Sequence, residues 1–554
     1  MAVQRRALGR ALGGAAGLLA GILAFTSVAP AQSVTDNQRT LIVSLPGPFS
    51  GCGFLDPGAN ATSNAINDLL LPSAFATNPN GNLIGVGGPI ASAELVSLSP
   101  ETVVYTIAPH QRWSDGEPFT GRDLAAWWRR ARVLASVLSD GYRAIRTLKV
   151  SDKGLSVTAT FSSPYANWNH LFRDVEAPGS PAGCDISNLV TRPSLGPYRV
   201  RSATSSRIVL AMNSHWGLDP SRYGRLVLVA DANLPTTAST LFAGYSYSVT
   251  SGALQSLSTK PWMSSHLGNV SAIEEMTFAP ESASTRRILV REALSWFIDR
   301  QSLINHLWGS VTFSPSVAAS ALYSQGQSDY PGSAGTGPSN QTPTTRVTTT
   351  LPSGSVGAAD CPSCAPGALT SAGFVKVQGH WQSATGAPFS ITVATGPSDI
   401  DRQTTNLLAA TWRAAGVTVT VQTVGSDLSA AQSVAQSHVD VAVFSRPTST
   451  SPLYTARSYT GPAFPDTYPS GLSLPFATTL YARAQANFNP AAAVATWHRL
   501  DELLLSSYWV RPLFTPPSLV AWTSTVGGVN GALSVPGFTD EITGWNTVPA
   551  TSGS

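Results

Sequence analysis

Strand and helix patterns alternate most clearly in five consecutive segments, which read PFSITVAT (388–395), TTNLLAATWRAAG (404–416), VTVTVQTV (417–424), SDLSAAQSVAQSH (426–438) and VDVAVF (439–444). The first, third and fifth have the β-branched and apolar composition of strands, and the two between them are typical of helices. A strand–helix–strand–helix–strand order implies parallel pairing with right-handed crossovers. These segments therefore predict an α/β domain built on a parallel sheet.

The first half of the chain has a different character, because short antiparallel strands dominate it. The segments 95–107 and 148–161 each predict a hairpin with a central turn. One long helix is expected there, after WSDGEPFT (113–120). Thr120 can cap this helix, and apolar residues then follow at helical spacing as far as Leu138. The change of pattern between the two halves predicts two structural parts.

The charge of the chain excludes one class of partner. Lys and Arg number 34 against 31 Asp and Glu, and only 12% of the residues are charged, against about 25% in an average soluble domain. Arg5, Arg6 and Arg10 account for the excess, so 31 basic residues (34 minus 3) face 31 acidic ones from Gln32 onward. A neutral chain lacks the electrostatic footprint of nucleic-acid binding. We therefore expect no nucleic-acid partner.

The N-terminal 31 residues have the three-part pattern of a secretory signal peptide. A basic start (1–10) precedes an apolar run (11–25), and small residues stand at Ala29 and Ala31. We expect cleavage after about Ala31 and a periplasmic or otherwise extracytoplasmic protein. A retained membrane helix is the alternative, and the early arginine pair leaves the Sec and the twin-arginine routes open. No cysteine stands near the cleavage point, so lipid attachment is not expected.

Four cysteines remain, and they allow three disulfide connectivities. They are Cys52, Cys184, Cys361 and Cys364. An even number in an oxidising compartment favours disulfides. A local bridge between Cys361 and Cys364 is the simplest assignment, and it leaves Cys52 to pair with Cys184. The CPSC sequence also occurs in thioredoxin-like redox sites, but the Ala-Pro-Gly that follows disfavours a helix starting at Cys361.

The sequence has no arrangement typical of an enzyme. The eight histidines are isolated from one another, and neither a G-x-S-x-G elbow nor a phosphate-binding loop occurs. The carboxylate pairs Glu274-Glu275 and Asp501-Glu502 are adjacent in sequence, so their members point in different directions. We expect both pairs on solvated surfaces. We also expect no metal, no cofactor and no catalytic activity.

Several motifs occur in order along the chain. They are Leu55-Asp56-Pro57, WSDGEPFT (113–120) followed by Asp123, SLGPYRV (194–200), NSHWG (213–217), VREALSWFIDRQSLI (290–304) and VDVAVF (439–444). Together they resemble the extracytoplasmic solute-binding proteins of the peptide/nickel class, family 5, which serve ABC importers. One departure lies in SLGPYRV, where Ser194 and Leu195 replace the first glycine and the threonine of a G-T-G-P-Y pattern.

The resemblance implies an α/β, two-lobed periplasmic-binding-protein type II-like fold with an extra subdomain in the first lobe. The lobes of such proteins close on a ligand like a hinged clamp. The expected division of the chain is a signal peptide (1–31), a first lobe (32–280) with the WSDG subdomain (about 80–190), a second α/β lobe (281–510) with a Ser/Thr/Pro/Gly-rich loop (324–357), and a C-terminal return to the first lobe (511–554).

The segment after the strand 439–444 is expected to contact the ligand, because the carboxyl ends of parallel strands line the crevice of such sheets. Peptide-binding members of the family usually have an acidic residue there, which pairs with the peptide's α-ammonium. The segment 444–461 has no Asp or Glu, which favours a neutral, sugar-like or anionic ligand. Arg446 is the candidate for an anionic or hydroxyl-rich group, and Tyr454 and Tyr459 are candidates for stacking. Solvent exposure of Arg446 and core packing of the tyrosines are the alternatives.

The sequence therefore leaves two candidate functions. The first is an exported, monomeric receptor that captures an oligopeptide or another small solute and delivers it to an ABC permease and ATPase complex. The second is a non-transporting protein of the same fold that regulates cell-envelope mannoside or glycolipid assembly. The second rests on a looser similarity of GYRAI (141–145) and YANWNHLF (165–172) to a lipoprotein subgroup associated with that process.

Overall fold

A computed structural model of the chain describes most residues beyond position 38. The described residues are 39–49, 61–77, 83–180, 185–218, 221–246, 249–268, 272–311, 315–323, 327, 329–331, 360–447, 451–461, 467–472, 474–529, 538–539 and 542–547. The expected signal peptide, Cys52, Cys184 and most of the expected loop 324–357 lie outside this set.

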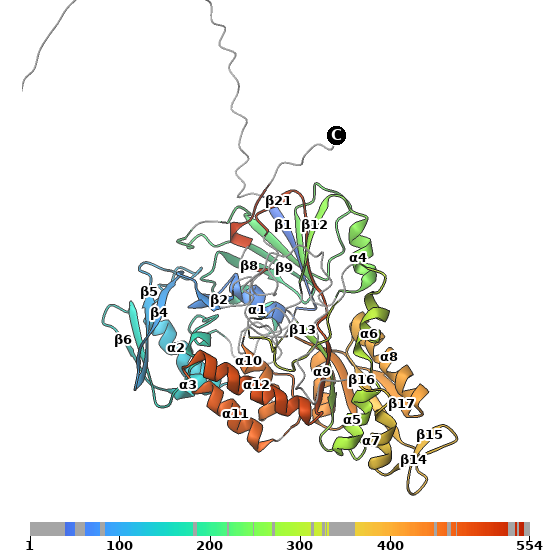
Figure 1. Cartoon of the computed structure of the whole chain (residues 1–554). Coiled ribbons are helices and arrows are strands. Elements are labelled where there is room, and N and C mark those ends of the chain that lie inside the picture. The colour runs from blue at the N-terminus through green and yellow to red at the C-terminus, as the bar shows by residue number, and fades with distance from the viewer. Residues whose placement is uncertain are drawn as a thin grey trace, which may run out of the picture.

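The largest sheet has seven strands in the order β12-β20-β11-β1-β10-β9-β8 (Figure 1). Its strands are β1 (Thr40–Leu45), β8 (Tyr198–Ala203), β9 (Arg207–Met212), β10 (Arg225–Ala230), β11 (Phe242–Ser246), β12 (Met263–Gly268) and β20 (Ser518–Thr523). The apolar strand β1 is central and runs parallel to β10 and β11, and its residues 43–45 are all buried. The sheet thus joins segments from the start, the middle and the end of the chain.

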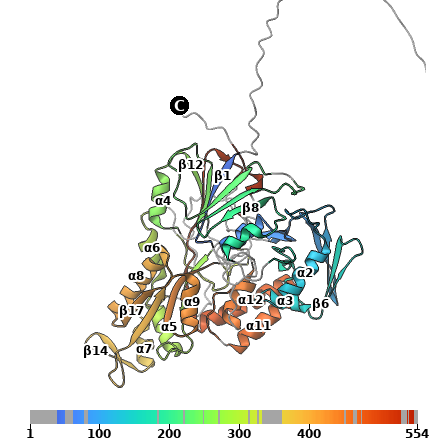
Figure 2. The same ribbon diagram turned by 180° about the vertical axis from the view of Figure 1, so that it is seen from behind.

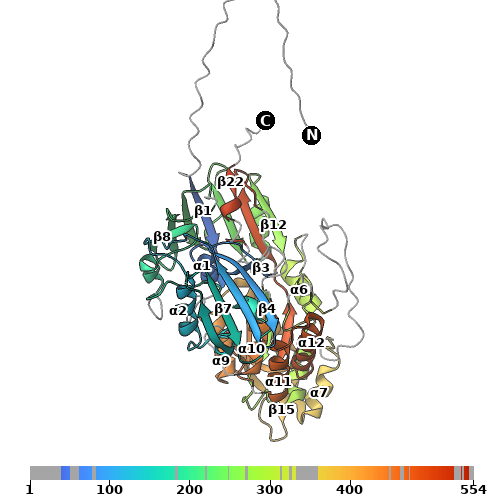
Figure 3. The same cartoon turned by 90° about the vertical axis from the view of Figure 1, so that its left-hand side faces the viewer.

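The two predicted hairpins form a four-stranded sheet of order β4-β5-β7-β6, which faces the viewer in Figure 3. Its strands are β4 (Ile90–Leu98), β5 (Glu101–Ile107), β6 (Ile145–Val150) and β7 (Ser156–Phe161). Helices α2 (Gly121–Ala131) and α3 (Ser139–Ala144) belong to the same unit. Thr120 caps α2 in a capping box with Asp123, as its sequence predicts.

The long helix expected as far as Leu138 ends earlier, and a separate short helix follows it. Helix α2 ends at Ala131, and α3 starts at Ser139. The buried Ser139 hydroxyl donates a hydrogen bond of 2.9 Å to the carbonyl of Ala131, so a side chain satisfies one of the helix's last carbonyl groups. Between the helices, Val133 is exposed.

The five-stranded sheet has the order β17-β16-β18-β13-β19. Its elements are β13 (Ala272–Phe278), β16 (Ser390–Thr395), α8 (Asp399–Ala415), β17 (Thr418–Thr423), α9 (Asp427–Ala435), β18 (Val441–Pro447) and β19 (Val510–Phe514). Strand β16 pairs in parallel with β17 and with β18, which confirms the predicted alternating unit. Helices α5 (Ile288–Trp296), α6 (Arg300–Trp308) and α8 pack on one face, and α9 packs on the other.

Three helices near the C-terminus lie beside the WSDG subdomain in both Figure 1 and Figure 2. They are α10 (Pro452–Thr460), α11 (Pro475–Gln485) and α12 (Pro490–Ser506). Buried apolar residues of these helices belong to the same hydrophobic cluster as those of the subdomain and the seven-stranded sheet. The backbone N–H of Ala166 also donates to the carbonyl of Gln485 over 2.7 Å. The subdomain and these helices are thus in direct contact.

The chain passes twice between the seven-stranded and the five-stranded sheet, first from β12 to β13 and later from β19 to β20. The strands that flank the two passages are neighbours, because β12 pairs with β20 and β13 pairs with β19, both antiparallel. Hinges between lobes consist of a few loop or strand-end residues, which suits such short passages. The lobe boundaries at 280/281 and 510/511 stay predictions.

The remaining elements are short. They are α1 (Ala61–Asp68), β2 (Phe75–Thr77), β3 (Leu83–Gly85), α4 (Ser251–Ser258), α7 (Ala365–Ser371), β14 (Phe374–Val377), β15 (His380–Ser383), β21 (Val526–Gly527), β22 (Asn546–Thr547) and 3-10 turns at Trp168–His170, Ile186–Thr191 and Ile542–Gly544. Within the described ranges, no helix combines the length and the apolar character needed to cross a membrane.

Candidate functional site

The carboxyl ends of β16, β17 and β18 lie at one edge of the five-stranded sheet, because these strands are parallel. Ligands of open α/β sheets bind beside such an edge. Arg446 is close to the end of β18, and Glu274 and Glu275 are close to the start of the antiparallel strand β13, directly beside it. Asp401 and Asp427 are in the first turns of α8 and α9. The edge is therefore rich in ionisable groups.

The predicted site residues Arg446 and Tyr459 meet around one carboxylate, that of Glu275. The Nε and Nη2 atoms of Arg446 donate to Glu275 Oε2 over 3.1 and 2.6 Å. The Tyr459 hydroxyl donates to the same carboxylate, 3.1 Å from Oε1 and 2.9 Å from Oε2. Arg446 Nη2 also donates to the carbonyl of Ala321 over 2.7 Å. All three side chains are buried, and each residue is only 1% exposed.

The electrostatics of this cluster follow from burial and from the opposed charges. Burial is the largest single effect and lowers the pKa of the Arg446 guanidinium, but the charges and hydrogen bonds of Glu275 and Tyr459 together outweigh it, and the pKa is raised. Burial raises the pKa of the Tyr459 hydroxyl well above its usual value, although Arg446 opposes this effect. Arg446 is therefore a permanent cation whose charge an internal carboxylate already balances.

The expectation that Glu274 and Glu275 lie on a solvated surface is wrong, because both are buried. Strand β13 lies between β18 and β19, and helices cover both faces of the sheet. Neighbouring residues of a strand point to opposite faces of the sheet, and because both faces are covered here, neither glutamate reaches solvent. The sequence gives no sign of this, because two consecutive glutamates are more often exposed.

The second glutamate cluster lies around Glu274 and contains three carboxyl groups. Glu274 accepts a hydrogen bond of 2.6 Å from the Ser445 hydroxyl, and it is also hydrogen bonded to Asp401. Burial, and then the charge of Asp401, raise the pKa of Glu274 well above its usual value. Burial and Asp401 raise the pKa of Asp427 in the same way. A shared proton is what allows carboxyl groups to approach so closely.

Tyr454, the third predicted site residue, lies on the same helix as Tyr459. It is half-buried on α10, and its ring is 6.0 Å from the ring of His170 in the WSDG subdomain, in an edge-on contact. Burial, followed by the charge of Arg173, lowers the pKa of His170 to about 3, so the imidazole is neutral. Tyr454 therefore belongs to the contact between α10 and the subdomain. No group of three His, Cys, Asp or Glu among the residues described is arranged to hold a metal ion.

Residues between Asp68 and Trp216 line a surface depression in the first part of the chain. It is lined by residues of two motif segments, Leu195-Gly196-Pro197 and Trp216, together with residues after α1 such as Pro72. A side chain at Gly196 would place its Cβ 2.3 Å from the carbonyl oxygen of Leu69, which explains why this motif position is glycine. None of the three predicted ligand-contacting residues lines this depression.

Asp501 is a further polar residue whose position the sequence does not predict. It was expected on a solvated surface together with Glu502, but it is buried. Its Oδ1 accepts the backbone N–H of Ala321 over 2.8 Å, and burial raises its pKa to about 6. The segment at Ala321 therefore joins Asp501 to Arg446, since Ala321 donates to one and accepts from the other.

Comparison with known proteins identifies the family of the chain. Residues 87–493 match the family model of the bacterial extracellular solute-binding proteins, family 5. This match covers more than half of the chain, and the chain belongs to that family. The oligopeptide-binding protein OppA of Mycobacterium tuberculosis is 32% identical over 196 residues, which are 32% of this chain and 33% of OppA.

Two further proteins are similar to the chain. LpqW of Mycobacterium tuberculosis, a probable monoacyl phosphatidylinositol tetramannoside-binding protein, is 28% identical over 242 residues, which cover 38% of this chain and 37% of LpqW. The similarity thus spans about a third of each curated relative. The solved structure of the oligopeptide-binding protein AppA of Bacillus subtilis, in complex with a nonapeptide, has a TM-score of 0.73 at 13% identity over 92% of this chain and 99% of AppA. The fold is the expected two-lobed, periplasmic-binding-protein type II-like α/β fold.

Proposed function

We propose that this protein is an exported receptor that captures an oligopeptide or another small solute between its two lobes and delivers it to an ABC importer. Membership of family 5 over residues 87–493 is the observation that carries the proposal. Two neighbouring chain passages between two separate sheets support it, because they permit hinged closure around a ligand. The receptor is further proposed to be a monomer, to carry a cleaved signal peptide and to have no catalytic activity.

The proposed ligand site lies at the carboxyl edge of the five-stranded sheet, with Arg446, Tyr454 and Tyr459 as its contacts. The geometry refines this proposal. Arg446 and Tyr459 are buried around Glu275, so a ligand reaches them only if the lobes or the segment at Ala321 move. Tyr454 is less buried and lies where α10 contacts the WSDG subdomain. A ligand that closes this contact would touch Tyr454 first.

Native mass spectrometry of the purified protein tests the receptor function. We expect a fraction of molecules to carry a bound mass that is lost on unfolding, and calorimetry with the identified compound to give a saturable isotherm. A chain that carries no additional mass and binds no component of a mixture of short oligopeptides would contradict a receptor role.

The contribution of Arg446 is tested with the ligand that this experiment identifies. Replacing Arg446 by Ala removes a charged hydrogen-bond donor, and we expect affinity to fall by about 1.5–3 kcal/mol. Unchanged affinity in a folded variant would remove Arg446 from the ligand site but would leave the receptor function intact.

The second candidate function is regulation of envelope mannoside assembly without transport. The similarity to LpqW over 242 residues favours it. The two functions differ in their partners, because import requires a permease and an ATPase. Deletion of the gene should abolish uptake of the identified ligand if the protein is an importer receptor. Normal uptake together with altered mannosylated lipids would favour the second function.

A further inference from the structure

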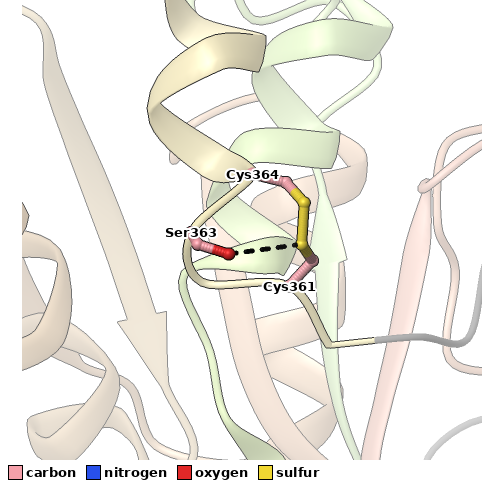
Figure 4. Close-up of a disulfide and its surroundings, with 3 residues drawn as sticks. All are labelled: Cys361, Ser363 and Cys364. Carbon is pink, nitrogen blue, oxygen red and sulfur yellow. Dashed lines mark hydrogen bonds between the residues drawn. A yellow bond between two sulfur atoms is a disulfide. The ribbon is translucent and has the colours of Figure 1, made fainter.

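The predicted bridge between Cys361 and Cys364 is present (Figure 4). The Cα atoms of the two cysteines are 5.3 Å apart, and the hydroxyl of Ser363 is 3.8 Å from Cys361 Sγ. Cys364 is exposed and Cys361 is half-buried. Helix α7 starts at the next residue, Ala365, and its second residue is a proline, which the first turn of a helix tolerates. A thiolate from solution can therefore approach these sulfur atoms.

The residue before the bridge, Asp360, is bound to two arginines. Its Oδ1 accepts from Arg300 Nε over 2.7 Å and from Arg511 Nη2 over 2.5 Å. Its Oδ2 accepts the backbone N–H of Arg300 over 3.1 Å. The two arginines are 2% and 1% exposed. Two buried guanidinium groups thus share one partly exposed carboxylate next to a disulfide.

The two arginines belong to elements close to the passage between the lobes. Arg511 is in β19, which returns the chain to the seven-stranded sheet a few residues later. Arg300 is the first residue of α6, and its Nη1 donates to the carbonyls of Ala318 and Pro512, over 3.0 Å each. Arg300 therefore also holds β19 directly. Displacement of Asp360 would leave both guanidiniums without this carboxylate, which is costly for buried charges.

We propose that the Cys361–Cys364 disulfide is a redox modification site, open to dithiol reductants, whose reduction loosens β19 and α6 through Asp360. The bridge limits the conformations of the turn and so holds the adjacent carboxylate in place. In the reaction, one thiolate of the dithiol attacks one sulfur of the bridge, which breaks the Cys361–Cys364 bond, forms a mixed disulfide and releases the other cysteine as a thiolate. The second thiolate of the dithiol then releases the protein. Two electrons and two protons pass to Cys361 and Cys364, and the dithiol becomes a cyclic disulfide.

The first experiment measures access to the bridge in the folded protein. The purified full-length protein is treated with dithiothreitol without denaturant, labelled with a thiol-specific alkylating reagent, and mapped by peptide mass spectrometry. We expect both Cys361 and Cys364 to be labelled. If they are labelled only after unfolding, the bridge is not a redox site and the proposal fails.

The second experiment measures the coupling through Asp360. Amide hydrogen exchange is compared in the wild type, the variant Cys361→Ser/Cys364→Ser, the variant Asp360→Asn and the combination of all three changes. The serine variant replaces chemical reduction, so that Cys52 and Cys184 are left as they are. Asp399→Asn is the control, because Asp399 forms an exposed ion pair with Arg402 elsewhere in the same lobe.

We expect the serine variant to raise exchange in residues 300–308 and 510–514 about tenfold, the factor that corresponds to about 1.4 kcal/mol. Asp360→Asn should have a similar effect, and the combined variant should add little, because both changes act through one contact. The hairpin 374–383 should not change. Unchanged exchange in α6 and β19, or effects that add in full, would overturn the proposed coupling. If Asp360→Asn does not fold, the contrast between β19 and the hairpin in the serine variant decides the question.

Discussion

Replacing Arg446 by Met should strongly destabilise the fold, whatever the ligand is. The Arg446–Glu275 pair is separated by 2.6 Å, and the two side chains are each only 2% exposed. Met fills much of the same volume but leaves the Glu275 carboxylate buried with the hydroxyls of Tyr459 and Thr277 and no counter-ion. Breaking a buried ion pair in this way costs about 3–5 kcal/mol. In a domain of 150–250 residues each kcal/mol lowers the melting temperature by about 2–4 °C, so we expect a decrease of roughly 6–20 °C.

The double variant Arg446→Met/Glu275→Gln shows whether the loss comes from the unpaired charge. With both charges removed, most of the stability should return, because a neutral replacement of a buried pair is often close to neutral in free energy. The control is Arg402→Met, which removes an exposed ion pair with Asp399 and should cost no more than about 1 kcal/mol. Thermal unfolding followed by circular dichroism measures all three. If the single variant melts within 2–4 °C of the wild type, equivalent to about 1 kcal/mol, or if the double variant is no more stable than the single one, the electrostatic explanation is refuted.

Three further variants test separate parts of the structure. Since burial raises the pKa of Asp501 to about 6, the folded state favours its protonated form. This stabilisation is complete below about pH 4 and is lost as the pH rises through 6. The free energy of unfolding of the wild type should therefore be about 3 kcal/mol higher at pH 4 than at pH 7.5 through this group, and Asp501→Asn should remove that difference in unfolding titrations at the two pH values. Gly196→Ala should cost about 1–3 kcal/mol in the same assay because of the approach to Leu69, whereas Gly367→Ala, with open space around it, should cost nothing. Thr120→Ala should cost about 1 kcal/mol by removing the cap of α2, and an unchanged melting temperature would contradict the importance of the capping box.

The parts of the fold that the sequence predicts correctly depend on local signals. The alternation of β16, α8, β17, α9 and β18 has its own periodicity, and the hairpins 95–107 and 148–161 have turn residues between their strands. Thr120 caps α2, as its residue type and position predict. Each of these features is settled by residues within a few positions of one another.

The contacts within the candidate site could not be predicted from the sequence, because they join distant parts of the chain. Arg446 and Glu275 are 171 positions apart, and Arg511 and Asp360 are 151 apart. Burial of Glu274 and Glu275 depends on the position of β13 in the middle of a sheet, which only the tertiary structure determines. The general tendency of charged residues to be exposed therefore does not hold for these glutamates or for Asp501.

This long-range pairing changes how the ligand can be inferred from the segment 444–461. The lack of Asp and Glu in that segment suggested an uncompensated Arg446, and hence a site hostile to a cationic peptide terminus. The structure supplies the carboxylate from another strand, since Glu275 accepts both Arg446 and Tyr459. Because this carboxylate is already paired, the cluster has no net charge to attract an anion or to repel a cation. The composition of the segment therefore does not determine the charge of the ligand, and the oligopeptides bound by relatives of this family remain suitable probes.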